Sequence, residues 1–594
     1  MKLAKRGWPL FFLAAVASYL YRLGALPFVG PDEPRYAQVA REMLSRADLV
    51  TPTLGGHTWF EKPALLYWMV MASFATFGVS EWAARLGPAC AGLLTILVVG
   101  WMGRSVERAC QHEGACQHEG PAAVDAGAID AREGAAQADE GRAGKDESTA
   151  RAENKESQAR GLGVWSALAL ASSVGLMIFS RAVSFDVIVT MTMTAALAFF
   201  FVSELEPDER RRGLLLAAFY VLTGASLLAK GLIGVVLPGG IICTYFLLQR
   251  KWPGKRLLMS LLWGVPLALL VAALWYGPVI QRHGWKFIDE FIIQHHFARY
   301  VSNKYHHPGP FYYYLPALLM LALPWPVFLL SALARITKWK WNAADAVSRM
   351  RLFALMWMLV PVAFFSVSGS KLPGYILPAL PGAALLVGEQ FARLVRGQAS
   401  SLTIRLTGLL LITLGAAGLI YLRRSADLPN LCAALMLGPV LLAGMVSLVA
   451  AHLSRLCLIA TACAMFLSIA LGVSCASGVI TKRESTRELL SAAAARGFER
   501  APVCGLYVIE RTAEFYAGTR MMREPDGEVT RFEGAAQVLD ATRRNGGGPL
   551  LVFVPLDALP QLTEYSALTT ELIGDNGTVA LVAVRERREI MKQE

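Results

Sequence analysis

The sequence joins an apolar run, LFFLAAVASYL at residues 10–20, to a charged segment, PDEPRYAQVAREM at residues 31–43. The apolar run follows the cations Lys2, Lys5 and Arg6, and no small-residue cleavage site comes after it. We therefore expect a retained membrane helix rather than a signal peptide. Ionisable side chains at a membrane boundary are costly unless they face one another or a polar cavity. The two segments together predict a membrane helix that opens onto a polar chamber.

The remainder of the 594-residue chain has the same apolar character. Hydrophobic residues make up 55% of it and charged residues only 17%, and the mean hydropathy of +0.44 is too high for a soluble globular protein. A membrane-crossing helix needs about 20 apolar residues. About thirteen segments meet this length, at 8–26, 82–104, 163–181, 186–203, 213–230, 232–249, 257–279, 311–330, 352–368, 373–390, 402–422, 430–451 and 455–478. The predicted fold class is an all-α polytopic membrane protein.

The loops between these spans predict the orientation of the chain. If the N-terminus is cytoplasmic, four loops rich in Lys and Arg fall on the cytoplasmic side, as the positive-inside rule requires. These loops are 207–213, 249–256, 334–351 and 393–405. They account for the net charge of +12, so the charge does not indicate nucleic-acid binding. The shorter run Pro63–Gly78 is expected to be an interfacial or re-entrant helix, because counting it as a span would invert every later loop.

Composition predicts four parts. Residues 1–106 hold the first helix, an external loop with interfacial helices, and the second helix. Residues 107–160 have almost no large apolar side chains, and we expect a disordered cytoplasmic insert there. Residues 161–480 form the remaining bundle, with external loops at 280–310 and 368–376. Residues 481–594 form a soluble domain across the membrane from the cytoplasm.

Cysteine usage gives little evidence for a metal or a disulfide framework. The hexapeptide ACQHEG occurs twice in tandem, at 109–114 and 115–120, and brings two Cys and two His together. That set suits zinc, but a flexible duplication is the favoured interpretation. The nine cysteines show no paired C-x-x-C spacing, so they are expected to be small core residues.

The soluble tail reads as a small α/β domain. A helix is expected around 485–495 and a helix or turn at 512–518, with strands at PVCGLYVI, PLLVFVPL and TVALVAV. No nucleotide-binding glycine signature precedes its helices, so no nucleotide cofactor is expected. The predicted role of this domain is structural or regulatory.

Three segments predicted to lie outside the cytoplasm hold polar groups near membrane depth. They are 31–62, 280–310 and SGSKLPGYILPALP at 368–381. Loop parity places them on one side, together with Asp186 at the mouth of a span. The cations among them suit a lipid-linked phosphate. The carboxylates suit a general base or the stabilisation of a sugar's developing positive charge. Sugar transfer from a polyprenyl phosphate needs both kinds of group.

Simpler explanations exist for several of these residues. Asp32 and Glu33 could cap a helix N-terminus, although capping explains only one carboxylate. Lys62 could extend from a helix end towards the membrane surface. Lys371 resists that explanation, because three prolines that follow it break the helix, and such breaks usually line a cavity.

These motifs resemble those of the lipid A aminoarabinose transferases and related members of the protein mannosyltransferase superfamily. The resemblance covers roughly residues 8–390 and, more weakly, EFYAG in the tail. It rests, in order, on DE followed by RY, AREML, FEKP, SRAVSFDVIVT, HHFARY, HHPGPFYYYLP and SKLPGYILPALP. The resemblance implies a C-type integral-membrane glycosyltransferase fold. It also implies inverting transfer of 4-amino-4-deoxy-L-arabinose from undecaprenyl phosphate to lipid A at the periplasmic face of the bacterial inner membrane.

The resemblance also implies residue roles. Asp32 matches the family's essential aspartate, and Asp186 matches a second acidic residue of the cavity. Donor phosphate contacts are implied for Lys62, Arg299 and Tyr375. A structural divalent metal site is implied at Glu61 with either His295 or His296.

The chemistry of the neighbouring residues extends these sets. Glu33 joins the predicted catalytic carboxylates, while Arg35 and Lys371 join the predicted substrate-binding cations. A monomer is expected. Two alternatives stay open at this point: the same chemistry on a protein Ser or Thr or on another glycan, and a secondary transporter or lipid flippase. The sequence shows no convincing internal repeat, which argues against the transporter.

Overall fold

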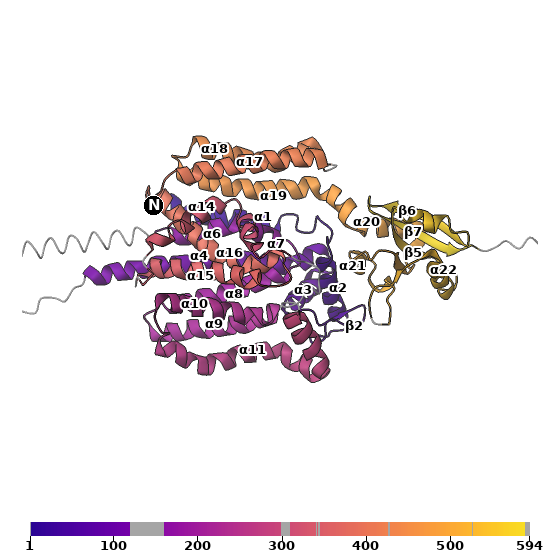
Figure 1. Ribbon diagram of the computed structural model, residues 1–594, viewed down its shortest axis with the longest axis horizontal. Helices are drawn as coiled ribbons and strands as arrows, with labels where there is room; N and C mark the ends of the chain where they lie inside the picture. Colours follow the sequence, from indigo (N-terminus) through magenta and orange to yellow (C-terminus); the bar gives the residue numbers. More distant parts are fainter. Residues whose placement is uncertain are drawn as a thin grey trace, which may run out of the picture.

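The computed structural model describes residues 2–118, 160–298, 309–339, 341–342, 345–425, 428–525 and 527–587. A long helical bundle carries a small sheet domain at one end, while the N-terminus lies at the opposite end (Figure 1). The first external loop lies between the bundle and the sheet domain. This arrangement decides where the polar side chains of the loop can meet other parts of the chain.

Within the described ranges, nine helices are long and apolar enough to cross a membrane. They lie in α4 (Glu81–His118), α8 (Phe185–Ser203), α9 (Glu209–Lys230), α11 (Lys255–Phe287) with η1 (Ile288–Ala298), α15 (Ala346–Ser366), η3 (Pro373–Ala379) with α16 (Leu380–Val395), α17 (Leu402–Ser425), α18 (Asn430–Val449) and α19 (Ser454–Glu484). A tenth span results if α6 (Leu162–Ala171) and α7 (Val174–Ser180), bent by 60°, are counted as one. The prediction of a helical multi-pass membrane fold is confirmed.

The other predicted spans are shorter or broken helices. The first is α1 (Lys2–Leu20), whose apolar part is Phe11–Leu20, and another is α10 (Ile233–Gln249). The segment predicted at 311–330 consists of α13 (Tyr314–Leu321) and α14 (Pro326–Leu333), followed by η2 (Ile336–Lys338). Two prolines between 323 and 327 account for the break, because proline cannot donate the backbone hydrogen bond that a continuous helix needs.

The first external loop contains α2 (Asp32–Ser45), the hairpin strands β1 (Thr53–Leu54) and β2 (His57–Thr58), and α3 (Leu65–Phe77). With 13 residues, α3 is shorter than a span, as expected for the run Pro63–Gly78. The N-cap of α2 is Pro31, which forms no side-chain hydrogen bond to the helix. Capping therefore does not explain the acidic pair in the first turn of α2.

The C-terminal domain is a mixed sheet covered by short helices. Its strands are β3 (Val503–Leu506), β4 (Arg531–Phe532), β5 (Leu550–Pro555), β6 (Leu568–Asp575) and β7 (Val579–Glu586), in the order β4-β3-β5-β7-β6. β3 runs parallel to β4 and β5, and β7 runs antiparallel to β5 and β6. The helical segments are α20 (Arg487–Ala493), η4 (Ala494–Phe498), α21 (Ala513–Tyr516), η5 (Gly518–Arg520), α22 (Ala535–Arg544) and α23 (Leu559–Thr563). The expected small α/β domain is present.

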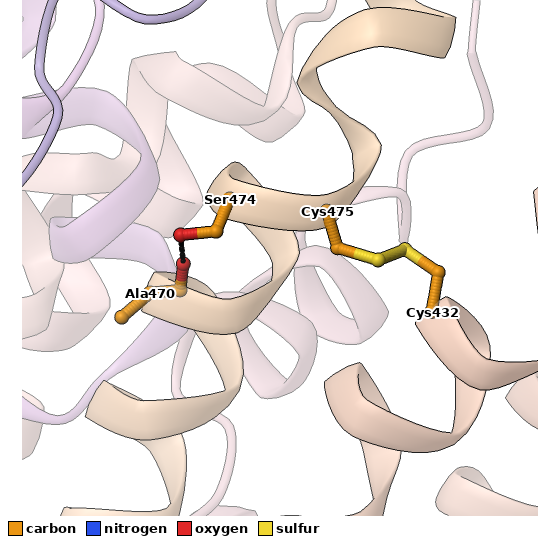
Figure 2. Close-up of a disulfide and its surroundings, with 4 residues drawn as sticks. All are labelled: Cys432, Ala470, Ser474 and Cys475. Carbon is orange, nitrogen blue, oxygen red and sulfur yellow. Dashed lines mark hydrogen bonds between the residues drawn. A yellow bond between two sulfur atoms is a disulfide. The ribbon is translucent and has the colours of Figure 1, made fainter.

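Two details differ from the sequence-based expectations. α4 continues to His118, so the prediction that a disordered insert begins at 107 is wrong at that boundary; the second ACQHEG repeat extends beyond the described residues. Cys432 of α18 and Cys475 of α19 form a disulfide (Figure 2), so these two are not isolated core cysteines. The two residues are 43 positions apart and become neighbours because α18 and α19 pack side by side.

Candidate active site

The exposed end of α2 carries an ion pair. Arg35 Nη2 lies 2.8 Å from Asp32 Oδ1, and Arg35 Nε donates a hydrogen bond to the Pro31 carbonyl at 2.8 Å. The guanidinium carbon of Arg35 lies 5.6 Å from the ring centre of Trp59, which is close enough for a cation–π contact. The Asp32 side chain is 55% exposed, so the carboxylate is held in place but remains accessible to a substrate.

A second pair follows the β1–β2 hairpin. Lys62 Nζ donates a hydrogen bond to Glu61 Oε1 at 2.8 Å, and both side chains are largely buried. Burial by itself lowers the pKa of Arg35, but the carboxylates of Glu61 and Asp32 raise it above its ordinary value. Burial and the same two carboxylates raise the pKa of Tyr36. The hairpin therefore brings Glu61 within electrostatic reach of the first turn of α2, and Lys62 is paired rather than extended towards the membrane surface.

A third pair connects two spans. Asp186, in the first turn of α8, forms an ion pair with Lys230 at the end of α9. Lys230 Nζ lies 4.8 Å from the ring centre of Tyr375. A side chain at Gly374 would collide with the Asp186 carboxylate, so glycine is required where η3 passes this pair. Asp186 and Tyr375, both predicted site residues, thus meet around a lysine that the sequence analysis treated only as the end of a span.

An aromatic cluster brings the three pairs to the same end of the bundle. The ring centres of Tyr36 and Phe185 lie 4.9 Å apart, and those of Tyr67 and Phe185 lie 5.3 Å apart. These rings belong to α2, α3 and α8, and Phe185 directly precedes Asp186. Edge-to-face contacts of this kind fix the relative positions of the elements that carry them.

Glu33 is placed differently from Asp32. Its carboxylate is buried and accepts hydrogen bonds from Arg85 at 2.8 and 3.0 Å and from the Val183 N–H at 2.8 Å. Arg85 also donates to the carbonyls of the chain segment that precedes α2. With its oxygens occupied by protein donors, Glu33 holds α2 against α4 and the start of α8. This geometry argues against the predicted catalytic role.

Lys371 is also occupied by the protein. Its buried ammonium donates hydrogen bonds to the carbonyls of Ser366 at 3.1 Å and Ser368 at 2.6 Å, at the C-terminal end of α15. A cation at this position satisfies carbonyls that have no partner within the helix. In the structure the Lys371 ammonium therefore caps the C-terminal end of α15. This role differs from the predicted contact with the donor phosphate.

A cavity of about 340 Å³ lies between the first external loop and the C-terminal domain. The hairpin, η1 and the C-terminal domain each contribute to it, and its charged or imidazole-bearing lining residues are His57, Glu61, Glu290, His295, Arg511, Glu514, Arg523 and Glu528. The indole N–H of Trp59, which also lines the cavity, has no acceptor within the described part of the chain. A buried donor of this kind is available to a polar group of a substrate.

The predicted metal ligands are only partly placed. Glu61 and His295 line the same cavity, whereas the side chain of His296 lies outside the described residues. Among those that are described, no group of three His, Cys, Asp or Glu side chains could hold a metal ion. The metal site therefore stays a prediction. Arg299, the remaining predicted phosphate ligand, also lies outside the described residues.

The tail docks on the first external loop through EFYAG. Arg41 Nη2 donates to the Phe515 carbonyl at 2.8 Å, and its guanidinium lies 4.5 Å from the Phe515 ring centre. The Tyr516 hydroxyl accepts a hydrogen bond from the Phe28 N–H at 2.9 Å and donates one to Glu81 at 2.9 Å. One tyrosine thus connects the C-terminal domain to Phe28, which precedes α2, and to Glu81, the first residue of α4.

A charged cluster of the tail forms one wall of the cavity. The fully buried carboxylate of Glu514 pairs with Arg511 at 3.0 Å and with Arg523 at 3.2 Å. Arg523 lies against the hairpin at Gly55, where any side chain would collide with its guanidinium. Sequence analysis gave these residues no site role. The only sequence feature that pointed to this region was EFYAG, which resembles the tail of the aminoarabinose transferases.

Comparison with known proteins gives three findings. Residues 9–109 match the family described as dolichyl-phosphate-mannose-protein mannosyltransferase. The undecaprenyl phosphate-alpha-4-amino-4-deoxy-L-arabinose arabinosyl transferase of Aeromonas salmonicida is 30% identical over 399 residues, which cover 67% of this chain and 61% of that protein. The protein of the same name from Pseudomonas paraeruginosa is 30% identical over 426 residues, covering 70% and 66%. The matched region thus spans 61% to 66% of the length of these relatives.

The fold is also found in solved structures. The crystal structure of ArnT from Cupriavidus metallidurans bound to undecaprenyl phosphate superposes with a TM-score of 0.74, covering 97% of this chain and 98% of that one, at 23% identity. Its apo state gives a TM-score of 0.72. The likeness covers both the bundle and the C-terminal domain, and it confirms the membrane glycosyltransferase fold.

Proposed function

We propose that this chain, whose residues 9–109 match the dolichyl-phosphate-mannose-protein mannosyltransferase family, transfers a sugar from undecaprenyl phosphate to an acceptor. The sugar proposed is 4-amino-4-deoxy-L-arabinose and the acceptor is lipid A, in line with the names of the relatives. One observation carries the proposal. Three cation–carboxylate pairs from separate parts of the chain meet at one end of the bundle, and they are Arg35–Asp32, Lys62–Glu61 and Lys230–Asp186.

The cations suit the donor phosphate. When the bond between the anomeric carbon and the phosphate oxygen breaks, the departing polyprenyl phosphate gains a negative charge. Arg35, Lys62 and Lys230 are each paired with one carboxylate before a donor binds. A phosphate can share these donors, and its binding to them becomes stronger as its charge increases in the transition state. The largely buried positions of the two lysines limit the water that would weaken this effect.

Asp32 is the accessible carboxylate of the set. Attack by an acceptor oxygen on the face opposite the departing phosphate inverts the anomeric centre. If the acceptor is a hydroxyl, Asp32 accepts its proton as a general base. If the acceptor is a lipid A phosphate, no proton has to be removed, and Asp32 stabilises the positive charge on the sugar ring.

We place this reaction at the periplasmic face of the bacterial inner membrane. The loops rich in Lys and Arg lie at the end of the bundle away from the site, which the positive-inside rule assigns to the cytoplasm. The disulfide joins the start of α18 to the last part of α19, towards the end that carries the C-terminal domain (Figures 1 and 2). Disulfides persist in oxidising compartments such as the periplasm, which supports this orientation.

Replacing Asp32 tests the proposal. We expect Asp32→Asn to abolish transfer of labelled sugar from undecaprenyl phosphate in a purified assay, with unchanged expression and thermal stability, because the carboxylate is exposed and contacts only Arg35. Asp540→Asn, an exposed carboxylate on α22, is the matched control and should be fully active. Full activity of Asp32→Asn would remove the mechanism.

Two further experiments test the identity of the acceptor and whether the protein is an enzyme or a transporter. Membranes loaded with the labelled donor are offered lipid A, a Ser/Thr peptide or another glycan, and only lipid A should become labelled. The placement of the charged pairs at one end of the bundle, rather than at its midplane, favours an enzyme over a transporter. Proteoliposomes that move the donor without forming a glycosidic bond would instead support a transporter.

A further inference from the structure

Four arginines gather around one buried glutamate at the end of the bundle opposite the C-terminal domain. Glu389 of α16 is 1% exposed, and its Oε1 lies 2.6 Å from Arg351 Nη2 and 3.9 Å from Arg393 Nη1. Arg335 and Arg351 are close enough to Arg393 to repel it electrostatically, and Arg393 and Arg351 have the same effect on Arg396. We refer to these five residues as the Glu389 cluster.

The Glu389 cluster has more positive than negative charge. The five residues carry four guanidinium groups and a single carboxylate, so four positive charges minus one leave an excess of three. In the part of the chain that the structure describes, Arg335 and Arg396 form no ion pair. Burial lowers the pKa of Arg396 and Glu389 raises it, but Arg393 and Arg351 lower it further. Within the described residues, the cluster therefore has fewer anions than cations.

The cluster also has too few hydrogen-bond acceptors. Four buried nitrogens have no acceptor among the described residues: Nε of Arg335, Arg351 and Arg393, and Nη2 of Arg396. The second carboxylate oxygen of Glu389 also lacks a partner, but pairing it with one of these donors would leave three. Buried donors are nearly always satisfied in folded proteins, by protein, water or a bound ion.

Helix electrostatics do not explain the whole cluster. Arg393 and Arg396 lie at the C-terminal end of α16, where the helix dipole favours a cation. Arg335 follows the C-terminal end of α14, where the dipole also favours a cation, whereas Arg351 lies in the N-terminal part of α15, where it does not. The dipoles thus explain neither Arg351 nor the buried donors of the other three arginines that lack an acceptor among the described residues.

The position of the cluster indicates what kind of anion would bind. Its arginines lie at the ends of α14, α15 and α16, and two of the three helices are membrane-spanning by length and composition. They belong to the loops 334–351 and 393–405, which the positive-inside rule assigns to the cytoplasmic side. The end of a span lies at the depth of the lipid headgroups.

We propose that the Glu389 cluster binds the phosphate of an anionic phospholipid headgroup. The planar forks of arginine match phosphate oxygens, and basic pockets between membrane helices on the cytoplasmic side suit anionic lipids. Along α16, which follows η3, Glu389 lies about 14 Å and Arg396 about 24 Å from Leu380. The site is therefore distinct from the one proposed for sugar transfer and does not depend on it.

The test compares lipids bound to the full-length chain after purification in detergent. Native mass spectrometry measures retention of phosphatidylglycerol, cardiolipin and phosphatidylcholine added to the delipidated protein. The variant is Arg335→Gln with Arg396→Gln, which leaves both arginines near Glu389 Oε1 unchanged. We expect the wild type to retain the anionic lipids preferentially and the variant to lose about tenfold or more in their affinity. Arg405→Gln, an exposed arginine of α17, is the control and should bind as the wild type.

Each outcome decides the question. Equal retention of anionic lipids and phosphatidylcholine, or unchanged binding by the double variant, would overturn the proposal. Displacement of the lipids by millimolar inorganic phosphate would show that the cluster binds free phosphate and would overturn the lipid assignment. If the double variant fails to fold, Arg396→Lys keeps the charge but loses the fork, and reduced anionic-lipid retention is then expected. Unchanged retention there would count equally against the proposal.

Discussion

Asp32 and Glu33 are neighbours in the sequence, yet their surroundings differ. Asp32 is exposed and contacts one arginine at the surface, whereas Glu33 is buried between Arg85 and a backbone N–H. A sequence pattern cannot separate the two, because burial depends on which face of α2 meets α4. The structure therefore leaves the first carboxylate accessible to a substrate, whereas the second holds α2 in position.

This difference predicts opposite effects of two similar substitutions. Glu33→Gln leaves Arg85 buried without its counter-charge, and we expect unfolding to become easier by about 3 kcal/mol, seen as a lower melting temperature. The folded fraction should keep substantial transferase activity. Asp32→Asn should show the reverse, a normal melting temperature and no activity. A stable but inactive Glu33→Gln variant would restore its catalytic role.

Lys230 is one of the candidate site residues that sequence reasoning missed. It looked like the end of an apolar helix, and nothing in its local pattern showed that α8 would bring Asp186 to it from 44 positions away. The cue that could have found it is a single cation at the end of a span, directly before a glycine. Pairing of distant charges is a property of helix packing rather than of local sequence.

Removing this cation should weaken transfer. We expect Lys230→Met to lower kcat/KM for the undecaprenyl-linked donor by about 10- to 100-fold, because one charge-assisted contact to the leaving phosphate is lost. Lys230→Arg, which keeps the charge, is the control and should retain more activity. The double variant Lys230→Met with Asp186→Asn removes the unpaired carboxylate. Recovery of full activity in that double variant would mean that Lys230 only neutralises Asp186.

At the scale of elements, the sequence predicted most of the helices in the bundle. It predicted their ends and breaks less well. Long apolar runs identified the spans, because a helix in lipid must satisfy its own backbone. Breaks within them, such as the bend between α6 and α7, depend on packing and were not predicted. In the C-terminal domain the buried strands β5 and β7 were predicted from continuous apolar runs. β6 was missed because most of its side chains are not buried.

The contact between α21 and α2 should control how firmly the site is held. Tyr516→Phe removes one hydroxyl that joins the Phe28 N–H to Glu81, and we expect faster hydrogen exchange in residues 28–36 and a higher KM with a smaller change in kcat. Tyr507→Phe, which removes a tyrosine hydrogen bond to Gln561 on the outer side of the domain, is the matched control. Equal exchange in both variants would show that the docking contact does not stabilise α2.

At the scale of the whole molecule, one end of the bundle holds the proposed chemistry and the other holds the proposed lipid site. The three pairs and the cavity lie towards the end of the bundle that carries the C-terminal domain, and the Glu389 cluster lies in the half of α16 away from η3 (Figure 1). This separation means that substitutions in the Glu389 cluster can be examined without altering groups that would contact the sugar donor.

The bond between Tyr516 and Phe28 joins positions 488 residues apart. A ribosome that has just delivered Phe28 to the membrane must still make nearly the whole protein before the tyrosine arrives. On the orientation proposed above, the wall that Arg511, Glu514 and Arg523 provide is missing until these residues have been made and the C-terminal domain has crossed the bilayer. The nascent chain thus lacks this wall of the cavity during most of its synthesis, and the proposed site is assembled only late in translation.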